Sequence, residues 1–91
     1  MKRSDLRALA VERAENRCEF PDCDLIGPLE MAHLKGSGAG GSKYRDVPEN
    51  VAMLCQFHHG WLDGVMTPNM RRFENEMVFR KAINRPWPHR R

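Results

Sequence analysis

The sequence predicts a single small α+β domain spanning 1–91, and three observations lead to this class. Apolar residues recur at helical spacing near both ends, two short apolar runs in the middle are typical of strands, and Cys and His residues are paired at metal-ligand spacing. A chain this short buries only about 60–65% of its unfolded surface, so its core alone is marginal. We therefore expect a staple such as a bound metal ion.

The first predicted element is a helix over 4–16. Its apolar residues, from Leu6 to Ala14, recur at helical spacing, and Ser4 is the expected N-cap, with Asp5 favourable in the first turn. We expect this helix to serve as scaffold and its arginines to form a solvated face. These arginines are Arg3, Arg7, Arg13 and Arg17.

The middle of the chain, 18–66, is predicted to be the core of the domain. Short strands are expected over 29–34 and 51–54, joined by a loop that is rich in glycine and serine. A helix is expected from Cys55 to about Val65, despite Gly60.

A final helix is predicted over 68–83. Thr67 followed by Pro68 is a strong start signal, because proline suits the first helical position. Met70, Phe73 and Met77 then share one face, and we expect that stripe to pack in the core. The segment 85–91 that follows is predicted to be a basic tail.

All three cysteines belong to two short pairs of metal-ligand type. Cys18 and Cys23 are separated by four residues, Cys55 and His58 by two, and 31 residues lie between the pairs. A structural zinc ion takes four tetrahedral N or S ligands and leaves no position open. The spacing predicts a structural Zn²⁺ site whose removal unfolds the domain, whereas buried or free cysteines are the alternative.

Charge and hydropathy limit the cellular context. The last seven residues hold three of the 15 basic residues and none of the 12 acidic ones, so the rest of the chain is electrically neutral. Nucleic-acid affinity must then come from local patches and the tail. We find no signal-peptide pattern or membrane-spanning run, and the odd cysteine count is a poor disulfide framework, which predicts a cytoplasmic protein without membrane contact.

His33, Asn50 and His59 lie between and after the two Cys/His pairs, with 16 residues separating the first two and eight the last two. In this order and spacing the region from Cys18 to Asp63 resembles the His-Asn-His (HNH) endonucleases, most closely the compact zinc-containing forms of bacteria and their phages. The matching motifs are Leu29-Glu-Met-Ala-His33-Leu, the glycine-rich run Gly38 to Ser42, Asp46-Val-Pro-Glu-Asn50-Val and Leu54-Cys-Gln-Phe-His58-His59.

The resemblance implies a ββα-metal fold, in which a two-stranded antiparallel hairpin packs against the helix that carries His59. It also implies an enzyme that hydrolyses DNA phosphodiester bonds. His33 would be the general base, His59 would bind a divalent ion (Mg²⁺, Mn²⁺ or Ni²⁺), and Asn50 would hold His33 in place. Relatives of this type act in the bacterial cytoplasm or in the phage-infected host cell.

One position departs from the family pattern. The residue before the base is commonly a metal-binding aspartate or histidine, and here it is Ala32. Asp63, four residues after His59 on the same helical face, is the first candidate for the missing ligand, and Glu30, on the same strand face as Ala32, is the second. The alternative for Asp63 is a solvated or capping acid.

Basic side chains near these motifs are candidates for DNA contacts. Lys43 and Arg45 lie in the loop between His33 and Asn50 and either contact phosphates or are solvated. In the tail, arginines could neutralise phosphates while Trp87 stacks on a base, or Trp87 could pack on the core. The tail candidates are Arg85, Trp87, Arg90 and Arg91.

Three hypotheses of function follow. The first is a metal-dependent DNA endonuclease. The second is a non-catalytic zinc module that binds nucleic acid or protein, which Ala32 favours and His33 with Asn50 oppose. The third is an accessory subunit of a larger phage packaging or restriction machine. The sequence does not fix the oligomeric state, and a domain with one active site cuts both strands only as a dimer or in two encounters.

Overall fold

In the computed structural model, which describes residues 2–34, 45–65 and 72–84, a two-stranded antiparallel sheet occupies the centre of the fold. Strand β1 spans Leu29–His33 and strand β2 spans Val51–Cys55. Their register places Leu29 opposite Cys55 and His33 opposite Val51. The predicted strands are confirmed to within one residue, and so is the α+β class.

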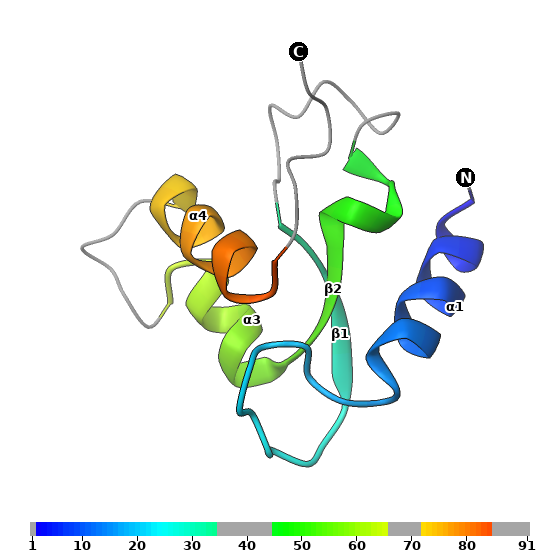
Figure 1. Ribbon diagram of the computed structural model, residues 1–91, viewed down its shortest axis with the longest axis horizontal. Coiled ribbons are helices and arrows are strands. Elements are labelled where there is room, and N and C mark those ends of the chain that lie inside the picture. The colour runs from blue at the N-terminus through cyan, green and yellow to red at the C-terminus, as the bar shows by residue number, and fades with distance from the viewer. Residues whose placement is uncertain (1, 35–44, 66–71, 85–91) are drawn as a thin grey trace.

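Helices cover both faces of this sheet (Figure 1). Helix α1, Arg3–Ala14, lies on one side, while α3, Gln56–Leu62, and α4, Arg72–Ala82, lie on the other. A 3₁₀ turn, η1, spans Pro48–Asn50 and leads directly into β2. None of the helices in the described part of the chain is both long and apolar enough to cross a membrane.

The core is divided in two by the sheet, because successive side chains of a strand point to opposite faces. The face toward α1 buries Leu6 and Ala10 of the helix against Val51 and Met53 of β2. The other face buries a larger cluster that joins the sheet to α3 and α4. Its members are Cys18, Ala32, Leu34, Ala52, Leu54, Cys55, Leu62 and Phe79.

Helix α1 differs from the prediction at its start and in its polar face. It begins at Arg3, the N-cap is Lys2 without a side-chain cap bond, and the expected cap at Ser4 is wrong. Arg13 is not simply solvated, because its guanidinium donates to the carbonyls of Pro48 and Val51 at 2.8 and 2.7 Å. These bonds tie α1 to η1 and to the start of β2.

The outer edge of β2 is closed by Glu19, which belongs to the turn after α1. Its main-chain N–H donates to the carbonyl of Met53 at 2.9 Å, and its carboxylate accepts the Met53 N–H at 2.8 Å. One residue therefore satisfies both main-chain groups that a third strand would otherwise pair.

Helix α3 ends earlier than the predicted boundary near Val65. Gly64 adopts φ 88°, a left-handed conformation that disfavours side chains. Its N–H donates to the carbonyl of Trp61, and the Val65 N–H donates to that of Gly60, which together form a Schellman cap. The helix therefore stops at Leu62, with Asp63 as its C-cap.

Helix α4 contradicts the predicted apolar core stripe. Phe73 and Met77 are each 51% exposed, so the expectation that this face is buried is wrong. The buried residues of the helix are instead Asn75, Glu76, Phe79 and Arg80, and only Phe79 among them is apolar. The start signal at 67–68, Met70 and the tail 85–91 lie outside the described residues.

Candidate functional site

Four predicted zinc ligands converge at one point. Cys18 and Cys23 come from the turn after α1, whereas Cys55 and His58 come from the junction of β2 and α3. Their ligand atoms all lie within 4.8 Å of one another, and His58 Nδ1 is 3.5 Å from Cys18 Sγ and 3.3 Å from Cys55 Sγ. This Cys₃His cluster could hold a structural metal ion such as zinc.

Burial and charge at the cluster fit a cation. Desolvation raises the pKa of the Cys18 thiol to about 12, and desolvation also lowers the pKa of His58, which keeps the imidazole neutral as a ligand must be. A bound metal ion would offset the cost of burying thiolates, because a thiol that coordinates a metal ion loses its proton. The ring of Phe20 stacks on His58 at 4.3 Å between centroids and shields it from water.

Cys55 has a second local role, as the N-cap of α3. Its sulfur accepts the main-chain N–H of His58 at 3.4 Å. The two-residue spacing of Cys55 and His58 thus follows from a single capped helical turn.

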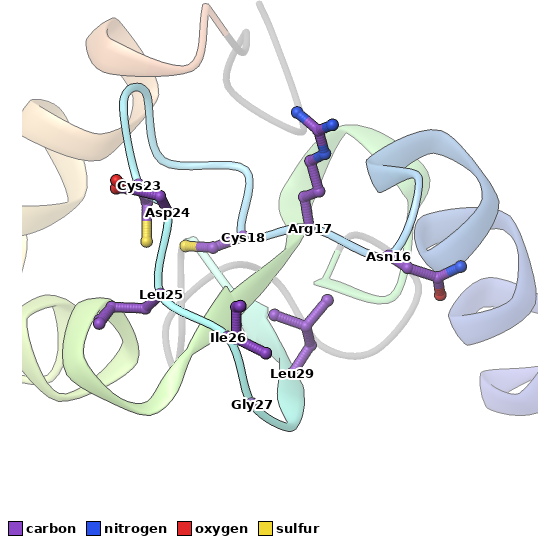
Figure 2. A pocket seen from close by; sticks show the side chains of 9 residues that line it. All are labelled: Asn16, Arg17, Cys18, Cys23, Asp24, Leu25, Ile26, Gly27 and Leu29. Carbon is purple, nitrogen blue, oxygen red and sulfur yellow. The ribbon is translucent and has the colours of Figure 1, made fainter.

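A cavity of about 400 Å³ lies beside the cluster (Figure 2). Cys18 and Cys23 line it, and the view shows their sulfur atoms facing each other across the turn. Leu25, Ile26 and Leu29 form its apolar wall. None of the predicted catalytic residues lines this cavity, so it belongs to the metal turn.

His33, at the end of β1, contacts a carboxylate. Its Nε2 lies 2.7 Å from Oδ1 of Asp46, and the imidazole and carboxylate are 16% and 14% exposed. Burial lowers the pKa of His33, an effect that Asp46 opposes and that the nearby Arg45 and Arg3 reinforce. The same hydrogen bond lowers the pKa of Asp46. A neutral imidazole therefore faces an ionised carboxylate near neutral pH.

Asn50 is fully buried and links three segments. Its side-chain amide donates to the carbonyl of Arg45 at 2.9 Å, its Oδ1 accepts from Arg80 of α4, and its carbonyl accepts the Leu34 N–H at 2.8 Å. Asn50 thereby connects the end of β1 with the residue before Asp46. Arg45 itself is only partly exposed, with Nε 3.9 Å from Asp46 Oδ1.

His59 points away from the Cys₃His cluster and lies between two carboxylates. Its Nδ1 is 2.5 Å from Glu30 Oε1, and its Nε2 is 3.6 Å from Asp63 Oδ2. Both acids are more than 40% exposed, whereas Ala32 is buried in the core at 1% exposure. Both candidates for the missing ligand thus contact His59, on opposite sides of its ring.

The predicted site residues fall into two unequal groups. Among the described residues, 2–34, 45–65 and 72–84, one group of at least three metal-ligating side chains has ligand atoms that converge, and it is the Cys₃His cluster. His33, Asn50 and His59 have separate partners and form no such cluster. The remaining DNA-contact candidates lie outside the described residues. They are Lys43, Arg85, Trp87, Arg90 and Arg91.

Sequence reasoning missed three residues that hold the histidine region together. Asp46 lay in a matching motif without a role, and Arg72 and Arg80 lay in the predicted final helix, where only the apolar stripe had been singled out. Glu76 pairs with Arg72 at 2.7 Å and lies midway between the two arginines. A charged stripe at four-residue spacing was thus the signal, because such residues share one helical face.

No family model, curated protein or solved structure matches this chain. Its function is therefore inferred from the residues and their geometry.

Proposed function

We propose that this chain is a metal-dependent DNA endonuclease of the His-Asn-His type, and that β1, β2 and α3 form a ββα-metal fold. The observation that carries the proposal is the 2.7 Å contact between His33 Nε2 and Asp46 Oδ1. A carboxylate that holds one imidazole nitrogen fixes the tautomer and the orientation of the ring. This is the arrangement that a general base requires, and the ring keeps some exposure to water.

The proton chemistry follows from this pair. With its proton on Nε2 donated to Asp46, the imidazole has a lone pair on Nδ1. That nitrogen removes a proton from the water molecule whose oxygen bonds to phosphorus, while the bond to the leaving oxygen breaks and that oxygen is protonated by solvent. The Asp46 carboxylate stabilises the imidazolium formed in this step, as a carboxylate does beside any catalytic histidine.

Asn50 acts on the base through the loop. Because its amide donates to the carbonyl of Arg45, the neighbouring Asp46 stays beside the end of β1. The Asn50 carbonyl also accepts the N–H of Leu34, the residue after His33. An amide can make these bonds without titrating, so this part of the support of the base does not change with pH.

A catalytic divalent ion would be held by one ring nitrogen of His59 together with one neighbouring carboxylate, Asp63 on the Nε2 side as the first candidate or Glu30 on the Nδ1 side as the second. One imidazole and two carboxylates are donors that Mg²⁺, Mn²⁺ and Ni²⁺ accept, and both acids already contact His59. When bound, the ion would neutralise charge on the phosphate and on the leaving oxygen. One of these two acids would replace the ligand that Ala32 lacks.

The test is plasmid cleavage with added Mg²⁺ or Mn²⁺, comparing the natural protein with His33→Ala. Loss of a general base is expected to lower the rate by about 10²- to 10⁴-fold. Gln56→Ala, an exposed change on α3, is the control and should cleave normally. Zinc content and thermal stability are measured in all three, and equal rates for His33→Ala and the natural protein would refute the assignment of the base.

A second candidate function, a non-catalytic zinc module that binds nucleic acid or protein, is favoured by the burial of Ala32. If the natural protein holds zinc and stays folded but does not cleave DNA with any added divalent ion, this alternative is favoured. DNA remains the proposed partner in the first case. The proposed setting is the cytoplasm of a bacterial or phage-infected cell, alone or within a packaging or restriction machine.

A further inference from the structure

Arg72, the first described residue of α4, contacts both halves of the proposed nuclease site. Its Nη2 donates to the carbonyl of His33 at 2.9 Å, and its Nη1 donates to the carbonyl of Leu34 at 3.0 Å. Its Nε lies 3.4 Å from Oδ1 of Asp63. The strand end that carries the base and the helix end that carries Asp63, one of the proposed ion donors, therefore meet at one guanidinium.

These contacts use the planar shape of arginine. A guanidinium presents donors along several directions in a fixed fork, whereas an ammonium is a point charge on a flexible stem. His33 is the last residue of β1 and Leu34 lies beyond it, so their carbonyls need donors from outside the strand. Arg72 supplies these donors and also holds Asp63, which already contacts His59.

The positive charge of Arg72 is neutralised by neighbouring carboxylates, which argues against a role in binding DNA phosphates. The side chain of Arg72 is only one-third exposed, and two carboxylates oppose its charge, Asp63 at 3.4 Å and Glu76 at 2.7 Å. Glu76 is almost fully buried, so it fixes the guanidinium from within the helix. A guanidinium that is paired with two carboxylates attracts a phosphate only weakly. It is well placed to fix the distance between His33 and the ion donors around His59.

We propose that Arg72 is a positioning residue of the nuclease site, which sets the separation between the base His33 and the ion donors around His59. The inference rests on the proposed function, since it presumes that these two histidines act in one reaction. It makes α4 part of the site, although this helix lies outside the segment that resembles the family.

The experiment measures kcat and KM for plasmid cleavage by the natural protein and by two variants, Arg72→Ala and Arg72→Lys. Misplacement of reacting groups by about 1 Å can cost about 100-fold in rate, so we expect kcat to fall about 100-fold in Arg72→Ala. KM for DNA should stay within about twofold of the natural value, because the charge of Arg72 is already compensated. Arg72→Lys keeps the charge but cannot reach three acceptors, and we expect a loss of about tenfold.

Two further measurements separate positioning from a merely structural role. Lys81→Gln removes an exposed cation from the same helix and should leave kcat unchanged. Millimolar guanidinium ion should restore part of the activity of Arg72→Ala, because it can occupy the vacated place. It should not restore activity to His33→Ala, and it cannot repair folding, since guanidinium weakens folded proteins.

The outcomes distinguish this inference from the proposed function. If the natural protein cleaves DNA and Arg72→Lys matches it in kcat, the positioning role is overturned while the nuclease assignment stands. The same holds if the loss in Arg72→Ala equals its loss of folded protein and guanidinium restores nothing. If Arg72→Ala fails to fold, Arg72→Lys decides. If the natural protein does not cleave, both proposals fall together.

Discussion

His58 and His59 are neighbours in the sequence, yet they lie in opposite kinds of surroundings. His58 is 8% exposed, close to the thiols of Cys18 and Cys55 and stacked on an aromatic ring. The side chain of His59 is 27% exposed and lies between two carboxylates that are themselves largely exposed. One step of about 100° around a helix therefore separates the closed Cys₃His cluster from the open surroundings of His59.

If the proposed function is right, one short helix serves both stability and chemistry. The Cys₃His cluster could supply all four ligands of one structural ion, which would leave no position for a substrate. Around His59 the carboxylates of Glu30 and Asp63 are within reach of solvent, and an ion held there could share a ligand position with a phosphate. The first arrangement favours a stable fold, and the second favours the exchange of water and phosphate at a bound ion.

The comparison would be tested most severely by removing a ligand from the closed cluster. Cys55→Ser keeps an N-cap oxygen for α3 but is expected to lose zinc and the cooperative fold, because zinc binding of about 10–16 kcal/mol is coupled to folding in such domains. Circular dichroism melts with zinc content, with and without chelator, measure this. A zinc-free variant that melts like the natural protein would show that the cluster is not a staple.

The open region should respond in the opposite way, in activity and not in folding. Asp46→Asn removes the carboxylate that orients His33 and stabilises the imidazolium, so the cleavage rate should fall by about 100-fold, within the range of general base catalysis. Zinc content and melting temperature should stay near those of the natural protein. Unchanged cleavage would mean that the Asp46 contact has no part in the reaction.

The carboxylates beside His59 should give a smaller effect. Glu30→Gln and Asp63→Asn each remove one charged donor, and we expect the concentration of Mn²⁺ for half-maximal cleavage to rise about 10-fold or more. Saturating ion should recover much of the rate. Glu12→Gln, an exposed change on α1, is the matched control, and an equal response from it would show that only general electrostatics is involved.

The smallest expected effect is in the pH dependence. Burial lowers the pKa of His33 below the ordinary 6.5, so the unfolded chain binds the proton more readily than the folded one. The resulting contribution to stability is fully present above about pH 6.5 and is lost as the pH falls through the lower folded pKa. His33→Gln should therefore lose less stability than the natural protein between neutral and mildly acidic pH, and equal losses would contradict the shift.

Much of the closed cluster could be predicted from the sequence, because its ligands come as two local pairs. The pair Cys55 and His58 spans one capped turn of a helix, so its geometry is set within a few residues. The strands were predictable to within one residue for the same reason, since short apolar runs and the turn residues between them are local signals. Only the meeting of the two pairs needed the fold.

The histidine region was less predictable because its contacts are distant in sequence. Arg72 reaches the carbonyl of His33 across 39 positions, and Arg80 reaches Asn50 across 30. In α4 these bonds prevailed over apolar periodicity. The paired arginines face the sheet while Phe73 and Met77 remain half exposed. A period shows which residues share a face, but not which face turns inward.

Glu19, which closes the outer edge of β2, follows Cys18 directly. The Cys₃His cluster, which includes Cys18, therefore also helps to hold Glu19 against the outer edge of β2. Strands with unpaired N–H and C=O groups are templates for pairing with other chains. If the cluster holds a structural ion, we expect loss of that ion to release Glu19 from Met53 and expose this edge, which would add edge-to-edge aggregation to unfolding.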